Sequence, residues 1–272
     1  MMNYFTALDV NQLDNYAFFS DKLPTSLLLS RTTLNLGFTV DSRQYTLFEL
    51  DKLINRAKAD ANTWRGTLDA FTSLHKELQL FIDEFILISQ QALEAPGTPD
   101  TARLFELATS KTFQLTKAFN QQQGTAIHLA TGTYTVLPRL IDYTYSNIYL
   151  FAQRENMLSN ATSIKVGPAW GRISGSISVA PNPTSAYRYA QAMKFIDAYL
   201  REYALSHMAY SNLTAHLTGL KEMTAHCVWQ SLQLRTITKA SRLKASVGIL
   251  LVSLREIQRT SAEAISLFQK RR

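Results

Sequence analysis

A regular spacing of apolar residues is the feature that most constrains the fold of this 272-residue chain. From residue 47 to residue 85 the steps alternate between three and four, which is typical of the buried seam of a long helix in a bundle or coiled coil. No proline interrupts residues 46–95, and Gly66, which costs a helix about 1 kcal/mol, leaves the phase unchanged. We therefore expect one continuous helix of about 70 Å. The seam comprises Leu47, Leu50, Ile54, Ala57, Ala61, Trp64, Leu68, Phe71, His75, Leu78, Ile82 and Phe85.

A second seam of the same kind lies near the end of the sequence. Residues 184–272 contain no proline, and Gly219 is a plausible hinge between two helices in this part. Between the two seams, a helix is expected over residues 101–123, capped by Asp100 and ended by Gly124. The second seam comprises Ala240, Leu243, Val247, Leu250, Leu254, Ile257, Ser261, Ala264 and Phe268.

The stretch from residue 118 to residue 187 is nearly free of charge. Residues 125–137 alternate weakly, Pro138 can open a helix that runs to about residue 158, and residues 164–179 resemble a short β-hairpin. Many tyrosines and few charges describe either a surface that meets lipid or protein, or a small subdomain buried by its neighbours. The six charged residues of this stretch are Arg139, Asp142, Arg154, Glu155, Lys165 and Arg172.

These patterns predict an all-α fold. We expect an elongated antiparallel bundle of long helices, formed by residues 1–117 and 188–272, with residues 118–187 displayed at one end as a small head insert that can contain the β-hairpin.

Composition and motifs limit the classes of function. A hydrophobic fraction of 46% excludes global disorder, and a single cysteine excludes a disulfide framework and a multi-cysteine metal site. We expect no cleavable signal peptide, and the sequence contains no apolar run long enough to cross a membrane, no phosphate-binding glycine loop and no zinc-protease motif. We therefore expect no enzyme activity, no cofactor and no metal.

The net charge of +7 is unevenly distributed. Residues 1–100 carry −5, residues 101–220 carry +5 and residues 221–272 carry +7. This asymmetry suits an anionic partner, an oligomer packed end against end, or two attracting parts of one fold. The basic tail, which includes Lys239, Arg242, Lys244, Arg255 and Arg259, leaves RNA binding open as an alternative. Arg201 and His207 also have the spacing found in one family of helical ribonucleases, a third possibility.

The run from Leu53 to Trp64 contains the pattern Ala-x3-Ala-Asn-x-Trp and leads into Leu68, Leu78, Phe81 and Phe85. This run resembles the first long helix of the haemolysin BL and non-haemolytic enterotoxin family, which are relatives of cytolysin A. The resemblance covers about 35 residues, and the length of the chain is similar to that of the shorter components of multi-part toxins in this group.

The resemblance implies an α-helical pore-forming toxin component. Such a protein is secreted, is soluble before it meets a membrane, and oligomerises with itself and with homologous subunits on or in the bilayer of a target cell. Its head would correspond to residues 118–187. The rival interpretation is a non-enzymatic helical assembly protein that binds RNA, as a nucleocapsid does, or another protein. The candidate membrane-contacting residues are Ile127, Leu129, Val136, Leu137, Ile141, Tyr145, Ile148, Tyr149 and Phe151.

Overall fold

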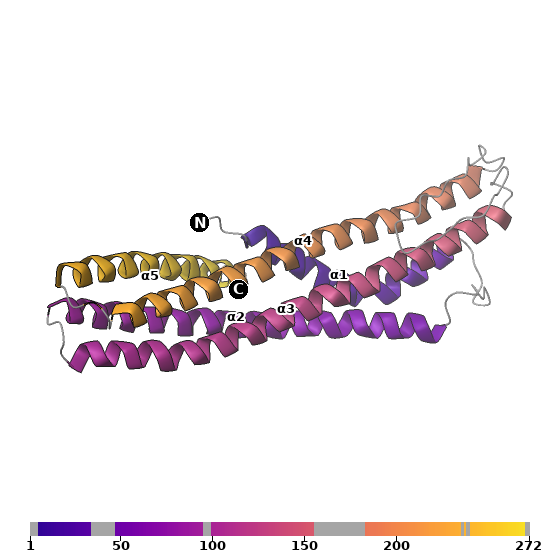
Figure 1. Cartoon of the computed structure of the whole chain (residues 1–272). Coiled ribbons are helices and arrows are strands. Elements are labelled where there is room, and N and C mark those ends of the chain that lie inside the picture. The colour runs from indigo at the N-terminus through magenta and orange to yellow at the C-terminus, as the bar shows by residue number, and fades with distance from the viewer. Residues whose placement is uncertain are drawn as a thin grey trace. The chain divides into compact units, whose positions relative to one another are not determined.

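The computed structural model describes residues 5–33, 47–94, 99–154, 183–234, 237 and 240–269. The regular elements of these ranges are five α-helices (Figure 1), which confirms the predicted all-α bundle. The β-hairpin predicted for residues 164–179 lies outside the described residues. The helices are α1 (Ala7–Thr33), α2 (Leu47–Glu94), α3 (Pro99–Arg154), α4 (Pro183–Gln233) and α5 (Ala240–Gln269).

The start of α1 is fixed by a reciprocal cap. The backbone N–H of Thr6 donates to Oδ2 of Asp9 at 2.7 Å, and the backbone N–H of Asp9 donates to Oγ1 of Thr6 at 3.4 Å. Such a capping box satisfies two amides that have no partner inside the helix. No helix was predicted here, because apolar residues lie on both sides of α1: Leu8 and Phe18 are exposed while Leu13 is buried.

The chain forms two compact units. Unit 1 comprises Met1–Asn11, Trp64–His128 and Ala209–Arg272, and unit 2 comprises Gln12–Thr63 and Leu129–Met208. Helices α1, α2, α3 and α4 therefore contribute residues to both units. The predicted head insert, residues 118–187, is likewise divided between the two units, and its residues 155–182 lie outside the described part of the chain.

Cross-helix contacts show that neighbouring helices of unit 1 are antiparallel. Lys221 of α4 donates to Oδ1 of Asn120 of α3 at 2.7 Å, and Gln123 donates to Oγ1 of Thr218 at 2.8 Å, so α4 descends as α3 advances. Helices α2 and α5 are related in the same way. His75 lies beside Ser261, and Asp83, eight residues further along α2, accepts a hydrogen bond from Gln258.

The two predicted seams are confirmed as the buried faces of α2 and α5. Gly66 lies inside α2, which runs unbroken through the predicted range. Where the seam side chains are described, all are buried except Ile54, Leu68 and Leu243, which are half-buried. Burial of a continuous apolar stripe outweighs the roughly 1 kcal/mol that a helix loses at one glycine.

Helix α3 corrects the predicted breaks at Gly124 and Pro138. It is one helix of 56 residues, and both residues lie inside it. A proline costs a helix interior about 3 kcal/mol, because it lacks an N–H and its ring crowds the preceding turn. That cost is offset by the buried positions that continue on both sides of it, among them Leu129, Leu137 and Thr144.

Helix α4 likewise corrects the predicted hinge at Gly219. The helix continues from Pro183 to Gln233, and an added Cβ at Gly219 would meet nothing within 4 Å. Helix α4 ends at Gln233, and the next helix, α5, begins at Ala240. Lys239 of the basic tail lies outside the described residues.

Candidate membrane-contacting face of α3

Five of the nine candidate residues lie in the hydrophobic core of unit 2. They follow one another along α3 at helical spacing, so they share one face of the helix. On this face they pack with residues of α1, α2 and α4, of which Tyr16, Ala57 and Tyr199 are fully buried. The five are Val136, Leu137, Ile141, Ile148 and Phe151, each at most 5% exposed.

The other four candidates are placed differently. Leu129 is buried, whereas Ile127 is 51% exposed. Tyr145 and Tyr149 lie on α3, but their side chains fall outside the described part of the chain. The candidates whose side chains are described thus divide into buried residues and one exposed side chain, Ile127.

Polar residues on the buried face of α3 form hydrogen bonds inside their own helix. Thr133 donates through Oγ1 to the carbonyl of Leu129 at 3.1 Å, and Thr144 donates to that of Leu140 at 2.8 Å. A hydroxyl that bonds to the preceding turn needs no partner from another helix. Nδ2 of Asn147 has no hydrogen-bond partner among the described residues. Apart from this amide, the face can enter an apolar medium with few polar groups left unpaired.

The two charged residues in the middle of α3 lie away from this face. Arg139 is exposed, and Asp142 is half-buried. Partial burial raises the pKa of the Asp142 carboxyl above its ordinary value. Helix α3 is therefore amphipathic in this part, with an apolar face and a polar back.

A buried polar cluster sits at the edge of the unit 2 core. Nε of Arg56 lies 3.0 Å from Oδ1 of Asp60, which is 2% exposed. The carboxyl group of Asp60 rests against Gly132 of α3, where an added Cβ would lie 2.8 Å from Cγ of Asp60. Burial raises the pKa of the nearby Tyr16 to about 12, and the charge on Asp60 adds to the shift. Sequence reasoning missed this cluster. Asp60 comes three residues after Ala57, which lies on the predicted seam, and this spacing could have indicated that the charge of Asp60 is buried.

A second cluster joins α3 to α4 in unit 2. The hydroxyl of Tyr134 and Nε2 of His207 are 2.8 Å apart, and Tyr203 completes an aromatic group with them. Arg201, the partner of His207 in the ribonuclease alternative, is exposed. Six residues along a helix correspond to about 240°, so the two side chains leave α4 in different directions.

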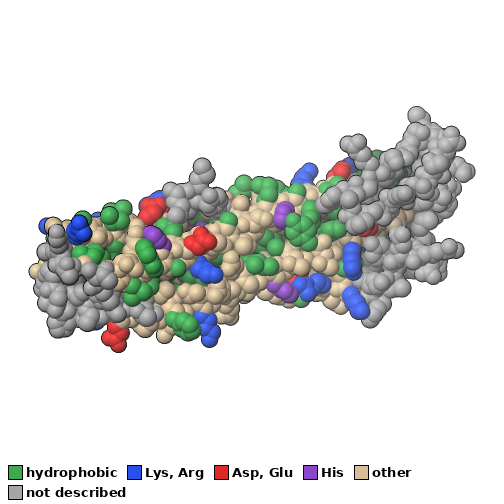
Figure 2. Space-filling model, in the orientation of Figure 1, with side chains coloured by type: hydrophobic (Ala, Val, Ile, Leu, Met, Phe, Trp, Pro, Cys, Tyr) green, Lys and Arg blue, Asp and Glu red, His purple; other side chains and the backbone are tan. Residues whose placement is uncertain are grey.

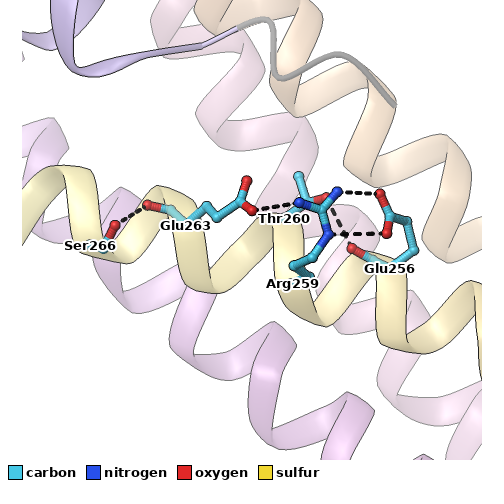
Figure 3. A network of polar contacts seen from close by, with 5 residues as sticks. All are labelled: Glu256, Arg259, Thr260, Glu263 and Ser266. Carbon is cyan, nitrogen blue, oxygen red and sulfur yellow. Dashed lines mark hydrogen bonds and ion pairs between the residues drawn. The ribbon is translucent and has the colours of Figure 1, made fainter.

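The basic tail is partly neutralised in α5. Arg259 lies 2.6 Å from the carboxylates of Glu256 and Glu263, one turn to either side (Figure 3). The bond from Arg259 lowers the pKa of Glu256. These pairs are exposed to solvent and contribute little to stability, but they occupy a guanidinium that the RNA interpretation needs for phosphates.

Several large apolar side chains of the described residues are exposed. On the face shown in Figure 2, hydrophobic side chains lie in separate patches among other side chains and backbone, with charged side chains scattered between them. No helix in the described ranges is both long and apolar enough to cross a membrane. In those same ranges no three histidine, cysteine, aspartate or glutamate side chains are grouped as metal ligands would be. The exposed set includes Leu80, Leu87, Phe113, Ile127, Trp229, Ile249 and Val252.

Comparison with known proteins gives a limited result. No protein-family profile matches the chain. No curated protein matches it in sequence. Among solved structures, the fold is similar to that of XaxA from Xenorhabdus nematophila, with a TM-score of 0.41 and 12% sequence identity over 99% of this chain and 98% of that one.

Proposed function

We propose that this protein is a component of an α-helical pore-forming toxin, which is secreted and assembles with itself and with homologous subunits at a target membrane. The observation that carries the proposal is the buried face of α3 in unit 2, which is apolar and whose threonines form hydrogen bonds within the helix. The resemblance of residues 53–64 to the first long helix of such toxins supports the same function.

The proposed membrane step exchanges one apolar environment for another. Apolar area is stabilised by about 25 cal/mol per Å² whether it is buried by α1, α2 and α4 or by lipid chains. Because one side of α3 is polar, the helix either lies in the interface or joins other copies. In such an assembly the apolar face contacts lipid, and the polar back with Arg139 and Asp142 faces the water-filled lumen.

The first test is flotation of the purified protein with liposomes, alone and mixed with the helical proteins encoded beside it, together with release of a trapped dye. We expect binding in at least one mixture, and dye release that rises steeply with protein concentration because assembly is required. Absence of binding in every mixture contradicts the proposal. Retention on RNA that is lost as salt rises, without any lipid binding, favours the rival RNA-binding function.

A variant with an unchanged core tests the role of α3. Ile127→Asp alters an exposed candidate side chain, so it leaves the packing of the bundle intact while placing a charge on the proposed lipid-contacting helix. We expect at least a tenfold loss of dye release. The matched control is Ile249→Asp on α5, which is 61% exposed and outside the candidate set. Equal losses in both variants would show that α3 has no special role.

A further inference from the structure

Two buried histidines face each other in unit 1. His75 of α2 is completely buried and His216 of α4 is 6% exposed, and their ring centroids are 5.3 Å apart. The rings of Phe5 and Phe268 lie 6.0 Å and 6.1 Å from His216 and His75 respectively, and Phe71 stacks on Phe268. We call these five residues, together with Ser261, the histidine box.

The hydrogen bonds of the histidine box define its protonation state. The hydroxyl of Ser261 donates to the backbone carbonyl of His75 at 3.1 Å, so its only hydrogen is used. Oγ of Ser261 therefore accepts from Nδ1–H of His75 at 3.0 Å, and Nε2 of that ring carries the free lone pair. Nε2 of His75 and Nε2 of His216 are both buried with no hydrogen-bond partner among the described residues. A proton added at Nε2 of either ring has no acceptor among the described residues.

Among the residues that the structure describes, no carboxylate stands ready to stabilise a charged ring. From α1, Asp9 accepts a hydrogen bond from Asn212, one turn before His216 on α4, and is thereby engaged. Burial, followed by the neighbouring His216, lowers the pKa of His75 to about 3. Burial lowers that of His216 to about 4. Other charged groups close in sequence to the box residues include Lys76 and Glu77 of α2, which are exposed, Lys221 of α4, which bonds to Asn120, and Arg259 and Glu263 of α5, which pair with each other.

The histidine box ties four segments together. Phe5 precedes α1, His75 and Phe71 belong to α2, His216 belongs to α4, and Phe268 lies in the last turn of α5. Phe5 and Phe268 each lie at the end of a helix, just before α1 and in the last turn of α5. Such helix ends can separate from the bundle while the rest of the bundle stays folded.

We propose that the histidine box is an acid-sensitive latch that holds the segment before α1 and the last turn of α5 against α2 and α4 at neutral pH and releases them below about pH 6. In the released state both imidazoles reach water and bind protons with the ordinary affinity of histidine. Acid therefore shifts the equilibrium toward release. For two groups with the pKa values given above, the ratio of released to closed forms rises by about 10³-fold between pH 7.5 and pH 5. The latch does not depend on the proposed toxin function, although release at acidic pH is a suitable trigger for it.

Hydrogen exchange measured by mass spectrometry tests the latch in the full chain. After correction for the intrinsic pH dependence of exchange, residues 5–10 and 261–268 are expected to lose protection by up to about 10³-fold between pH 7.5 and pH 5. Residues 192–199, in the core of unit 2, should show no comparable change. Because pH 5 lies above the ordinary pKa values of carboxylates, loss of protection at this pH is distinct from general acid denaturation. Equal changes in all three segments, or none in the first two, overturn the proposal.

Variants identify the responsible groups. The pair His75→Asn and His216→Gln supplies uncharged amides, and the Asn amide can replace Nδ1–H as the donor to Ser261. This double variant should keep its protection at pH 5, whereas His226→Gln, which changes an exposed histidine of the same α4, should behave like the unmodified chain. Titration of ¹³C-labelled histidines in the unmodified protein gives a result that does not depend on the folding of any variant. His75 and His216 should stay neutral while the latch is closed and bind protons only over the pH range in which residues 5–10 and 261–268 lose protection. Titration of both near pH 6.5 without any change in exchange contradicts the latch.

Discussion

At the scale of single residues, the contact between Gly132 and Asp60 shows why one position in α3 requires glycine. Gly132 and Gly124 are both interior to the same helix, yet their surroundings differ. A Cβ at Gly132 would overlap the buried carboxyl group of Asp60, whereas a Cβ at Gly124 would meet nothing within 4 Å. Only the first glycine has a packing role.

We therefore predict opposite effects for two identical substitutions. Gly132→Ala must displace Asp60 from its pairing with Arg56, and should lower the free energy of unfolding by about 2 kcal/mol. Gly124→Ala removes a flexible residue from an open helical site, and should raise the same quantity by about 0.5–1 kcal/mol. Urea denaturation of both variants measures the difference. A neutral Gly132→Ala would show that the carboxyl group of Asp60 moves aside at no cost.

At the scale of elements, the sequence identified the helices whose buried seam is regular. Helices α2 and α5 were predicted from apolar residues in steps of three and four. Breaks were predicted in α3 and α4 because Gly124, Pro138 and Gly219 are local signals of helix termination. Both helices continue through these residues, because burial against neighbouring helices outweighs the local cost, and that burial cannot be read from local sequence.

Candidate site residues were predictable only as a set. Low charge and many apolar residues directed attention to α3, and five of the nine candidates proved to share one buried face. Sequence alone does not show which side of a helix the neighbouring helices cover, so it did not separate Ile127 from that face. Contacts between distant segments, such as Asp60 with Gly132 or His75 with His216, have no signature in local spacing.

Pro138 provides a test of the continuity of α3. In Pro138→Ala, the new residue supplies an N–H to the preceding turn and removes the crowding of the ring, so the free energy of unfolding should rise by about 1–2 kcal/mol. Leu137→Ala, at the fully buried neighbouring position, should lower it by about 3 kcal/mol. Thermal and urea unfolding compare the two. A loss of stability in Pro138→Ala would mean that packing of the proline ring outweighs the gain in helix bonding.

At the scale of the whole molecule, different groups limit stability at the two ends of the pH range. His75 and His216 have pKa values lowered by burial, so the unfolded chain binds more protons below pH 6.5. The free energy of unfolding therefore falls as the pH decreases, by about 4 kcal/mol at pH 5 for the two groups together. Ionisation of Tyr16 makes the free energy of unfolding change with pH in the opposite direction. Because burial raises its pKa to about 12, the unfolded chain loses that proton first, and stability falls as the pH rises above 10.

The two limbs of the pH profile should respond to different substitutions. Tyr16→Phe keeps the buried ring in unit 2 but cannot ionise, so between pH 10 and pH 11 it should lose about 1 kcal/mol less than the unmodified chain, and its acid limb should be unchanged. The double variant of His75→Asn and His216→Gln should flatten the acid limb and leave the alkaline limb as it is. Urea unfolding of the three proteins at pH 5, 7.5, 10 and 11 gives both comparisons. A variant whose profile runs parallel to that of the unmodified chain through its own limb contradicts the assignment of that limb. The acid limb should appear in the unfolding of unit 1, which holds His75 and His216, and the alkaline limb in that of unit 2, which holds Tyr16.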